Sequence, residues 1–157
     1  MDDKGKVYVS NIQILYNDIQ KAINEYINSG HIYGEVKYIN AYLMAVLGAI
    51  AAYKDTVKKD VPETDEIKAC KYANNMLKHE PTIITHIEPE GGISFPISFP
   101  VAIEQIDIVW KWQDLNAYHQ NQKKAFKDLF AGKPVLNTLN TVLSQLNIEV
   151  PMCEILK

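Results

Sequence analysis

The sequence contains no arginine: all 16 of the residues in its Lys+Arg total are lysines. Arginine holds phosphate and carboxylate groups with a planar, bidentate fork, whereas lysine offers only a point charge. A codon bias in an AT-rich genome is a simple explanation for this absence. Whatever its origin, it excludes a binding or catalytic mechanism that depends on a guanidinium group.

The chain also has few cysteines, a small net charge and no long apolar run. Cys70 and Cys153 make neither a disulfide framework nor a CxxC metal motif, which predicts free thiols in a reducing compartment. A net charge of -3 gives no global basic field, no local basic patch is obvious, and nothing indicates DNA-specific binding. The apolar stretch 41–52 is shorter than the roughly 20 residues of a membrane span. Because the N-terminus has no leader-like apolar run, we expect a cytoplasmic chain without a membrane segment.

A length of 157 residues with 47% hydrophobic content suits one globular domain, residues 1–157. Apolar residues at alternating spacings of three and four predict its helices. The first is expected over 9–27, with Ser10 as N-cap and Gly30 as C-terminal stop. The second, over 36–57, has the longest apolar seam and is expected at the centre. Small residues on it predict the close approach of a neighbouring helix: Ala41, Ala45, Gly48, Ala49, Ala51 and Ala52.

A third helix is expected from Pro62 to about Glu80, where Pro81 stops it. Its core face consists of apolar residues at helical spacing, namely Ile67, Cys70, Ala73 and Leu77. A β-hairpin is predicted next, over about 82–99. Residues 82–87 are rich in β-branched side chains, 88–92 have turn chemistry, and 93–99 resume an extended pattern that contains a proline.

The last part of the chain is predicted to be helical again. Residues 101–109 suit either a strand or a helix, and a helix is expected from Trp110 onward, before Gly132. One face of it would carry Leu115, Tyr118, Gln122, Ala125 and Leu129, with Trp112 and Phe126 beside them. Pro134 begins a final helix with the stripe Val135, Leu139, Val142 and Leu146. The predicted fold is mainly α: an up-and-down bundle of four to five helices with one short β-hairpin inserted after the third.

The common motifs for phosphate loops, nucleophile elbows and HExxH zinc sites are missing. His86 has Glu88 and Glu90 near it, but solvent-facing polar residues of a hairpin are the favoured explanation for these three, because such sparse triplets rarely bind metal. No metal or cofactor is therefore expected.

One stretch of the third helix suits proton transfer. Asn75 and His79 are at i and i+4 and would touch, with Tyr72 on the same side and Lys71 and Lys78 in reach. An imidazole in this setting could exchange protons with a ribose hydroxyl and a leaving oxygen. The structural alternative is that Asn74 satisfies buried backbone and His79 caps the helix C-terminus.

Residues 73–80, Ala-Asn-Asn-Met-Leu-Lys-His-Glu, resemble the motif of the HEPN (higher eukaryotes and prokaryotes nucleotide-binding) superfamily. The resemblance implies a helical bundle, often dimeric, with a metal-independent RNA-cleaving centre. By position, Asn74 matches the polar motif residue and His79 the histidine, while Ala73 stands where an arginine is expected. The arginine would hold the phosphate, which a methyl group cannot do, although Lys71 or Lys78 would compensate in part.

From this resemblance we expect a homodimeric, non-catalytic or weakly active component of a bacterial or phage conflict system, of the toxin–antitoxin or phage-defence kind, with an RNA or protein partner. A metal-independent ribonuclease that uses His79 is one alternative. Another is an interaction module whose hairpin aromatics, Phe95, Phe99, Trp110 and Trp112, anchor a protein partner or else belong to the core. A ligand pocket lined by tyrosines inside the bundle is a third.

Overall fold

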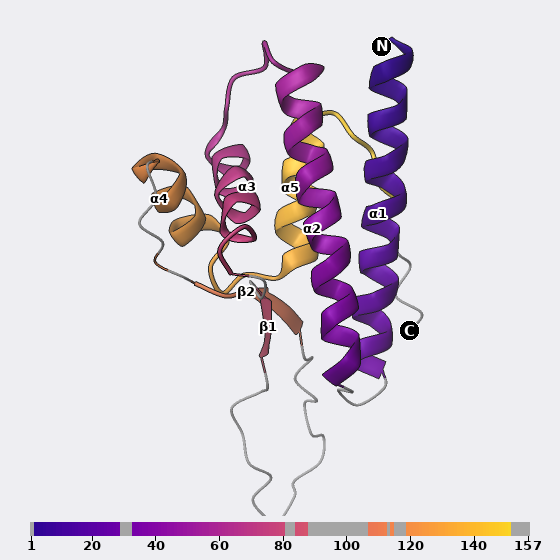
Figure 1. Ribbon diagram of the computed structural model, residues 1–157, viewed down its shortest axis with the longest axis vertical. Helices are drawn as coiled ribbons and strands as arrows, with labels where there is room; N and C mark the ends of the chain where they lie inside the picture. Colours follow the sequence, from indigo (N-terminus) through magenta and orange to yellow (C-terminus); the bar gives the residue numbers. More distant parts are fainter. Residues whose placement is uncertain are drawn as a thin grey trace, which may run out of the picture.

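The computed structural model describes residues 2–28, 33–80, 84–87, 107–112, 114 and 119–151 (Figure 1). Five helices and two short strands appear within these ranges. The protein is a mainly α helical bundle, as the sequence predicts. None of the described helices is both long and apolar enough to cross a lipid bilayer.

The two longest helices, α1 (Asp3–Asn28) and α2 (Tyr33–Thr56), lie side by side and run in opposite directions (Figure 1). The rings of Tyr8 and Tyr53 contact each other where the start of α1 meets the end of α2, with centroids 6.2 Å apart. The predicted apolar stripe of α1 is buried, from Ile12 through Tyr26. The pair therefore forms by burial of two facing apolar stripes.

The start of α1 was predicted wrongly. Asp2 is the N-cap, because its Oδ1 accepts a hydrogen bond from the Gly5 amide at 2.8 Å. Ser10, the predicted cap, is an exposed residue inside the helix. Gly30, the predicted stop, lies outside the described residues.

The inward face of α2 is confirmed: Ile39, Leu43, Val46, Ile50 and Tyr53 are buried. The prediction about its small residues holds for only part of the set: half-buried Ala49 packs against the core. Ala41 and Ala45 are exposed, and a Cβ built on Gly48 would meet no atom within 4 Å. No helix of the described chain approaches this outward side closely.

The third helix, α3 (Asp65–Met76), is shorter than predicted at both ends. Thr64 is its N-cap, with Oγ1 accepting a hydrogen bond from the Ile67 amide at 3.3 Å, so Pro62 lies before the helix. Residues 77–79 form a turn rather than a continuation of the helix. The predicted core face of α3 is confirmed, since Ile67, Cys70, Ala73 and Leu77 are all buried.

The strands β1 (Ile84–Ile87) and β2 (Asp107–Trp110) pair antiparallel, with Ile84 opposite Trp110 and Ile87 opposite Asp107. The first strand lies within the predicted 82–87. The second predicted arm, 93–99, lies outside the described residues. The uncertainty over 101–109 is resolved in favour of a strand at its end, and the prediction of helix from Trp110 onward is wrong.

Two more helices complete the bundle, α4 (Gln120–Leu129) and α5 (Val135–Gln145). The predicted stripe of α5 is confirmed, with Val135, Leu139 and Val142 buried. On α4 the buried residues are Ala125 and Phe126, whereas Leu129, predicted to face the core, is exposed. Gly132 links the two helices with a positive φ of 71°, a conformation that favours glycine.

The C-terminal helix is tied to the first one. Tyr16 donates a hydrogen bond from its hydroxyl to the Leu136 carbonyl at 3.3 Å, and Gln13 Nε2 donates to the Glu149 carbonyl at 2.6 Å. Burial raises the pKa of Tyr16. Figure 1 shows α5 behind α2, and the segment after α5 runs toward α1. The first helix and the C-terminal part of the described chain are therefore in contact.

Candidate functional site

The outward side of α3 carries the polar residues of the candidate site. Lys71 and Asn74 are three residues apart on α3, which places them on one side of the helix, and Lys78 lies in the turn that follows. All three are half-buried or exposed, as are Asn75 and His79. The structure therefore gives the segment a polar face that solvent reaches.

Tyr72 does not belong to that face. Its side chain is buried, and its ring packs against Phe126, with centroids 5.3 Å apart, and against Trp112. The prediction that Tyr72 lies on the same side as His79 is therefore wrong, because position 72 points toward α4.

Ala73, at the position of the motif arginine, is 0% exposed. It lies in the core with Ile67 and Met76 of the same helix. An arginine side chain at this position would start inside the apolar core, where an unpaired charge is strongly unfavourable. The chain therefore has neither the arginine nor an outward-facing place for one at position 73.

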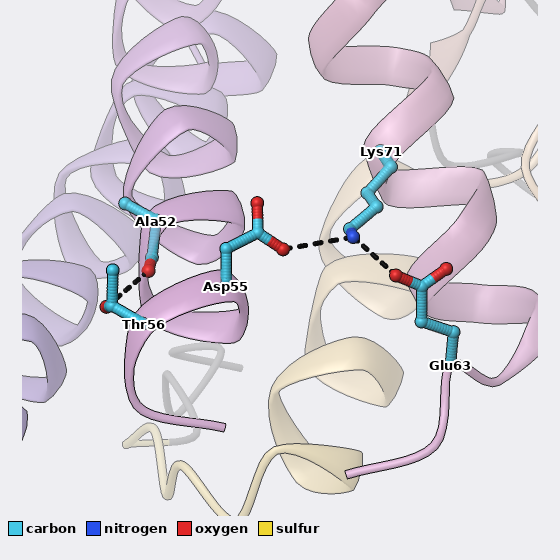
Figure 2. Close-up of polar contacts among 5 residues, drawn as sticks. All are labelled: Ala52, Asp55, Thr56, Glu63 and Lys71. Atoms are coloured by element: carbon cyan, nitrogen blue, oxygen red, sulfur yellow. Dashed lines mark hydrogen bonds and ion pairs between the residues drawn. The ribbon is translucent and has the colours of Figure 1, made fainter. Parts of the chain in front are cut away.

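Lys71 is held by two carboxylates from other segments (Figure 2). Its Nζ lies 3.0 Å from Asp55 Oδ1, at the end of α2, and also forms an ion pair with Glu63, just before α3. The Lys71 side chain is only 21% exposed. Burial alone would lower the pKa of Lys71, but the hydrogen bonds to Glu63 and Asp55 outweigh it and the pKa is raised. Lys71 thus stays charged and joins three segments, so it is not a free cation that could replace an arginine.

Lys78 and Asn75 form a second, more exposed contact. Lys78 Nζ donates to Asn75 Oδ1 at 3.3 Å, near the end of α3. Since Lys78 is exposed and Asn75 is half-buried, this pair stays accessible to a ligand. Of the two lysines proposed to compensate for the arginine, Lys78 is the one that remains available.

His79 is exposed and lies in the turn after α3, where its amide donates to the Met76 carbonyl at 2.9 Å. The predicted i, i+4 contact with Asn75 assumed a helix that continues to about Glu80, and the helix ends before that. Within the described part of the chain, no side-chain hydrogen bond joins His79 to Asn74 or Asn75. The turn leaves the imidazole open to solvent beside the end of the helix.

The sequence suggested the hairpin aromatics as a partner surface. The structure describes only the two tryptophans among them, and both pack against the core. Trp110 is 1% exposed, and Trp112 is half-buried, stacked on Tyr72 and Phe126. Phe95 and Phe99 lie outside the described residues. The two tryptophans thus help to close the core against α3 and α4.

The metal hypothesis at His86 falls on side chains outside the described residues, and of the tyrosines, Tyr38 and Tyr42 line an open pocket formed by residues of α1 and α2. No group of three or more His, Cys, Asp and Glu side chains among the described residues could hold a metal ion. The side chain of His86 and residues Glu88 and Glu90 are not among the parts of the chain that the structure describes. Four tyrosines fill core positions rather than line a chamber: Tyr16, Tyr26, Tyr53 and Tyr72.

The carboxylates that bind Lys71 were not predicted from the sequence. Asp55 and Glu63 precede it by 16 and 8 residues and lie on different segments, so no helical spacing connects them. Comparison of the chain with known protein families, with curated proteins and with solved structures finds no match.

Proposed function

We propose that this chain is a HEPN-like, cytoplasmic helical-bundle protein that binds RNA at the end of α3 without cleaving it efficiently. In this proposal it acts as a homodimeric component of a bacterial or phage conflict system of the toxin–antitoxin or phage-defence type. Three accessible side chains support the RNA site, since Asn74 is half-buried and Lys78 and His79 are exposed. An imidazole, a lysine and an amide together suit a ribose–phosphate backbone.

The fully buried side chain at position 73 is the observation that favours binding over catalysis. Cleavage of a phosphodiester needs a cation that stabilises the developing charge on the phosphate. With Ala73 in the core and Lys71 paired to Asp55 and Glu63, Lys78 is the one of the two candidate lysines that is left to do so. A single exposed lysine is a poor substitute, because water screens its charge.

Fluorescence anisotropy with a labelled single-stranded RNA tests binding, and gel analysis with and without EDTA tests cleavage. We expect measurable binding that His79→Ala and Lys78→Ala weaken, together with slow or no cleavage. Lys59→Ala is the matched control for Lys78→Ala, since Lys59 is also exposed and also lies in the turn that follows a helix, that of α2. Rapid, EDTA-resistant cleavage that His79→Ala abolishes would refute the non-catalytic assignment, and absence of RNA binding would refute the RNA assignment.

The outward side of α2 supports the homodimer. Tyr38 is 65% and Met44 44% exposed, and exposed Ala41 and Ala45 lie between or beside them, with no charged residue from 38 to 53. Small residues let the backbones of two helices approach closely. Such a face suits a second copy of the same helix, which would cover it about a two-fold axis.

Light scattering after gel filtration measures the oligomeric state. We expect a dimer for the natural sequence and a monomer for Ala45→Glu, whose carboxylate would be trapped between the helices. Ser144→Glu, at an exposed position on α5, is the matched control and should remain dimeric. A monomer for the natural sequence, or a dimer that Ala45→Glu leaves intact, would refute this arrangement.

A further inference from the structure

Positive charge is concentrated in one short part of this acidic protein. Residues 111–133 contain five lysines and two aspartates, a formal charge of +3, whereas the whole chain carries -3. The remaining residues therefore carry -6 together. This segment contains α4 and the residues that join it to β2 and α5.

Four of the five lysines are exposed, and none of the four forms an ion pair within the described part of the chain. These lysines are Lys111, Lys124, Lys127 and Lys133. The fifth, Lys123, is paired with Asp114. We call the four exposed lysines the α4 lysine cluster.

The fold brings the ends of this segment together. The Trp110 amide donates to the Lys133 carbonyl at 3.2 Å, and the Gly132 amide donates to the Trp110 carbonyl at 2.9 Å. Lys111 and Lys133 are 22 residues apart in the sequence. Because these two hydrogen bonds join the backbones of Trp110, Gly132 and Lys133, the fold brings the two lysines close to each other along the backbone.

Lys127 connects the helix to this junction. Its Nζ lies 5.7 Å from the centroid of the Trp112 ring, and Lys111 is the residue just before Trp112. Lys124 lies about one turn earlier on α4, on the side opposite buried Ala125 and Phe126. Within the α4 lysine cluster, Lys127 thus lies beside the half-buried Trp112 ring, and Lys111 directly precedes Trp112 in the chain.

The chemistry of the cluster fits a flexible polyanion with bases. Lysines recognise phosphates by charge alone, and the accessible part of the half-buried Trp112 indole, beside Lys127, offers an apolar contact to an unpaired base. Four lysines beside a helix of 10 residues provide few phosphate contacts for the two backbones of a duplex. A short single strand needs only a few such interactions.

We propose that the α4 lysine cluster, around Trp112, is a binding surface for single-stranded RNA. This inference rests on the proposed RNA function and adds to it a surface made of residues other than His79 and Lys78. The strand would place its phosphates on the lysines of α4 and of the β2–α5 junction.

Charge reversal of two lysines tests the surface. We expect Lys124→Glu/Lys127→Glu to weaken anisotropy-measured binding of a labelled oligo(U) by about tenfold at low salt, because two lysine–phosphate interactions are removed. The slope of log affinity against log salt should fall in magnitude by roughly 1.4, which is about 0.7 for each phosphate no longer neutralised. Lys4→Glu/Lys6→Glu is the matched control: both lysines are exposed, and α1 lies across the bundle from α4 (Figure 1).

The outcomes separate this inference from the proposed function. If the α4 double variant and its control bind oligo(U) as well as the natural sequence does, the surface is wrong while RNA binding stands. If duplex RNA of equal length binds as tightly as oligo(U), the assignment to single strands is wrong. If the natural sequence binds no RNA, both proposals fail. Weakening by the α4 variant alone, with circular dichroism unchanged, supports the surface even if His79→Ala has no effect.

Discussion

Trp110 Nε1 donates a hydrogen bond of 2.7 Å to Thr138 Oγ1 and so ties strand β2 to helix α5. The Thr138 hydroxyl also lies 2.9 Å from the Val135 carbonyl, one turn earlier in its own helix. The indole is almost fully buried and packs against Phe126 and Phe130. Its only polar atom is thus satisfied at the point where the sheet meets the bundle.

Thr138→Val should therefore destabilise the protein. The substitution keeps the shape of the side chain but leaves a buried indole N–H without its acceptor, at a cost of about 1–3 kcal/mol. Urea unfolding followed by tryptophan fluorescence measures the change. Thr141→Val on the same helix is the control, because Thr141 is exposed and bonds only to the Asn137 carbonyl among described residues. Equal losses in both variants would contradict the role of the Trp110–Thr138 bond.

The bridge from Lys71 to Asp55 and Glu63 should stabilise the fold in a pH-dependent way. Lys71→Met is expected to lower the free energy of unfolding at pH 7 by about 1–2 kcal/mol, since it removes two charge-assisted hydrogen bonds at a partly exposed site. Lys68→Met is the control: Lys68 Nζ lies 2.7 Å from Asp65 Oδ1, but the pair is on the surface, so a clearly smaller loss of stability is expected.

The sign of the pH effect follows from the raised pKa of Lys71. The native state holds the proton more tightly than the unfolded chain, so the stabilisation is complete below the unfolded pKa of roughly 10.4. It is lost as the pH rises through the native value. Urea titrations at pH 7 and pH 11 should therefore show the gap between the natural sequence and Lys71→Met narrowing. A gap that widens at pH 11 would contradict the bridge.

Cys70 should be chemically inert in the folded protein. It is buried in α3, and burial raises the pKa of its thiol to about 12. At pH 8 roughly one thiol in ten thousand is then the reactive thiolate. In a Cys153→Ser variant we expect no reaction with a disulfide reagent in native buffer and one equivalent after urea unfolding. Rapid reaction without urea would show that α3 opens or that the thiol is accessible.

Arginine at position 73 should damage the fold rather than restore catalysis. Ala73→Arg would put a guanidinium into the core, and we expect a loss of at least about 3 kcal/mol in urea unfolding. Asn74→Arg, one residue later and half-buried on the outward side, should be tolerated. Should Ala73→Arg prove as stable as Asn74→Arg and cleave RNA, the assignment of position 73 to the core would be wrong.

The helical parts of the fold were predictable because their signal is local. The buried stripes of α1, α2, α3 and α5 coincide with the apolar residues at spacings of three and four, since a helix must turn one face to the core. The errors concern the ends of the helices, where capping hydrogen bonds and turns, rather than the apolar spacing, set the first and last residue. Asp2 extends α1 beyond the first apolar repeat, and α3 ends at Met76 although Pro81 was the visible stop.

The candidate site was predictable in its residue types but not in its geometry. The spacing of Asn74 and His79 can be read from the sequence, whereas the turn that removes His79 from the helix cannot. The prediction misplaced Tyr72. Its position lies between the polar and the apolar face of α3, and the contacts of its ring with Phe126 and Trp112, which are distant in the sequence, decide that it is buried. The basic segment 111–133 could have been found by counting charge in windows along the chain.

By itself, the sequence determined that this protein is mainly helical, that it has no guanidinium chemistry, and which apolar stripes of α1, α2, α3 and α5 fill its core. Composition and periodicity determine these features because they act within a few turns of chain. The tertiary structure decided which polar groups remain available. It pairs Lys71 with distant carboxylates, buries position 73, places Lys127 over the Trp112 ring, and joins the backbone of Lys133 to that of Trp110. Such interactions join residues from separate segments, and their energies exist only once the chain has closed on itself.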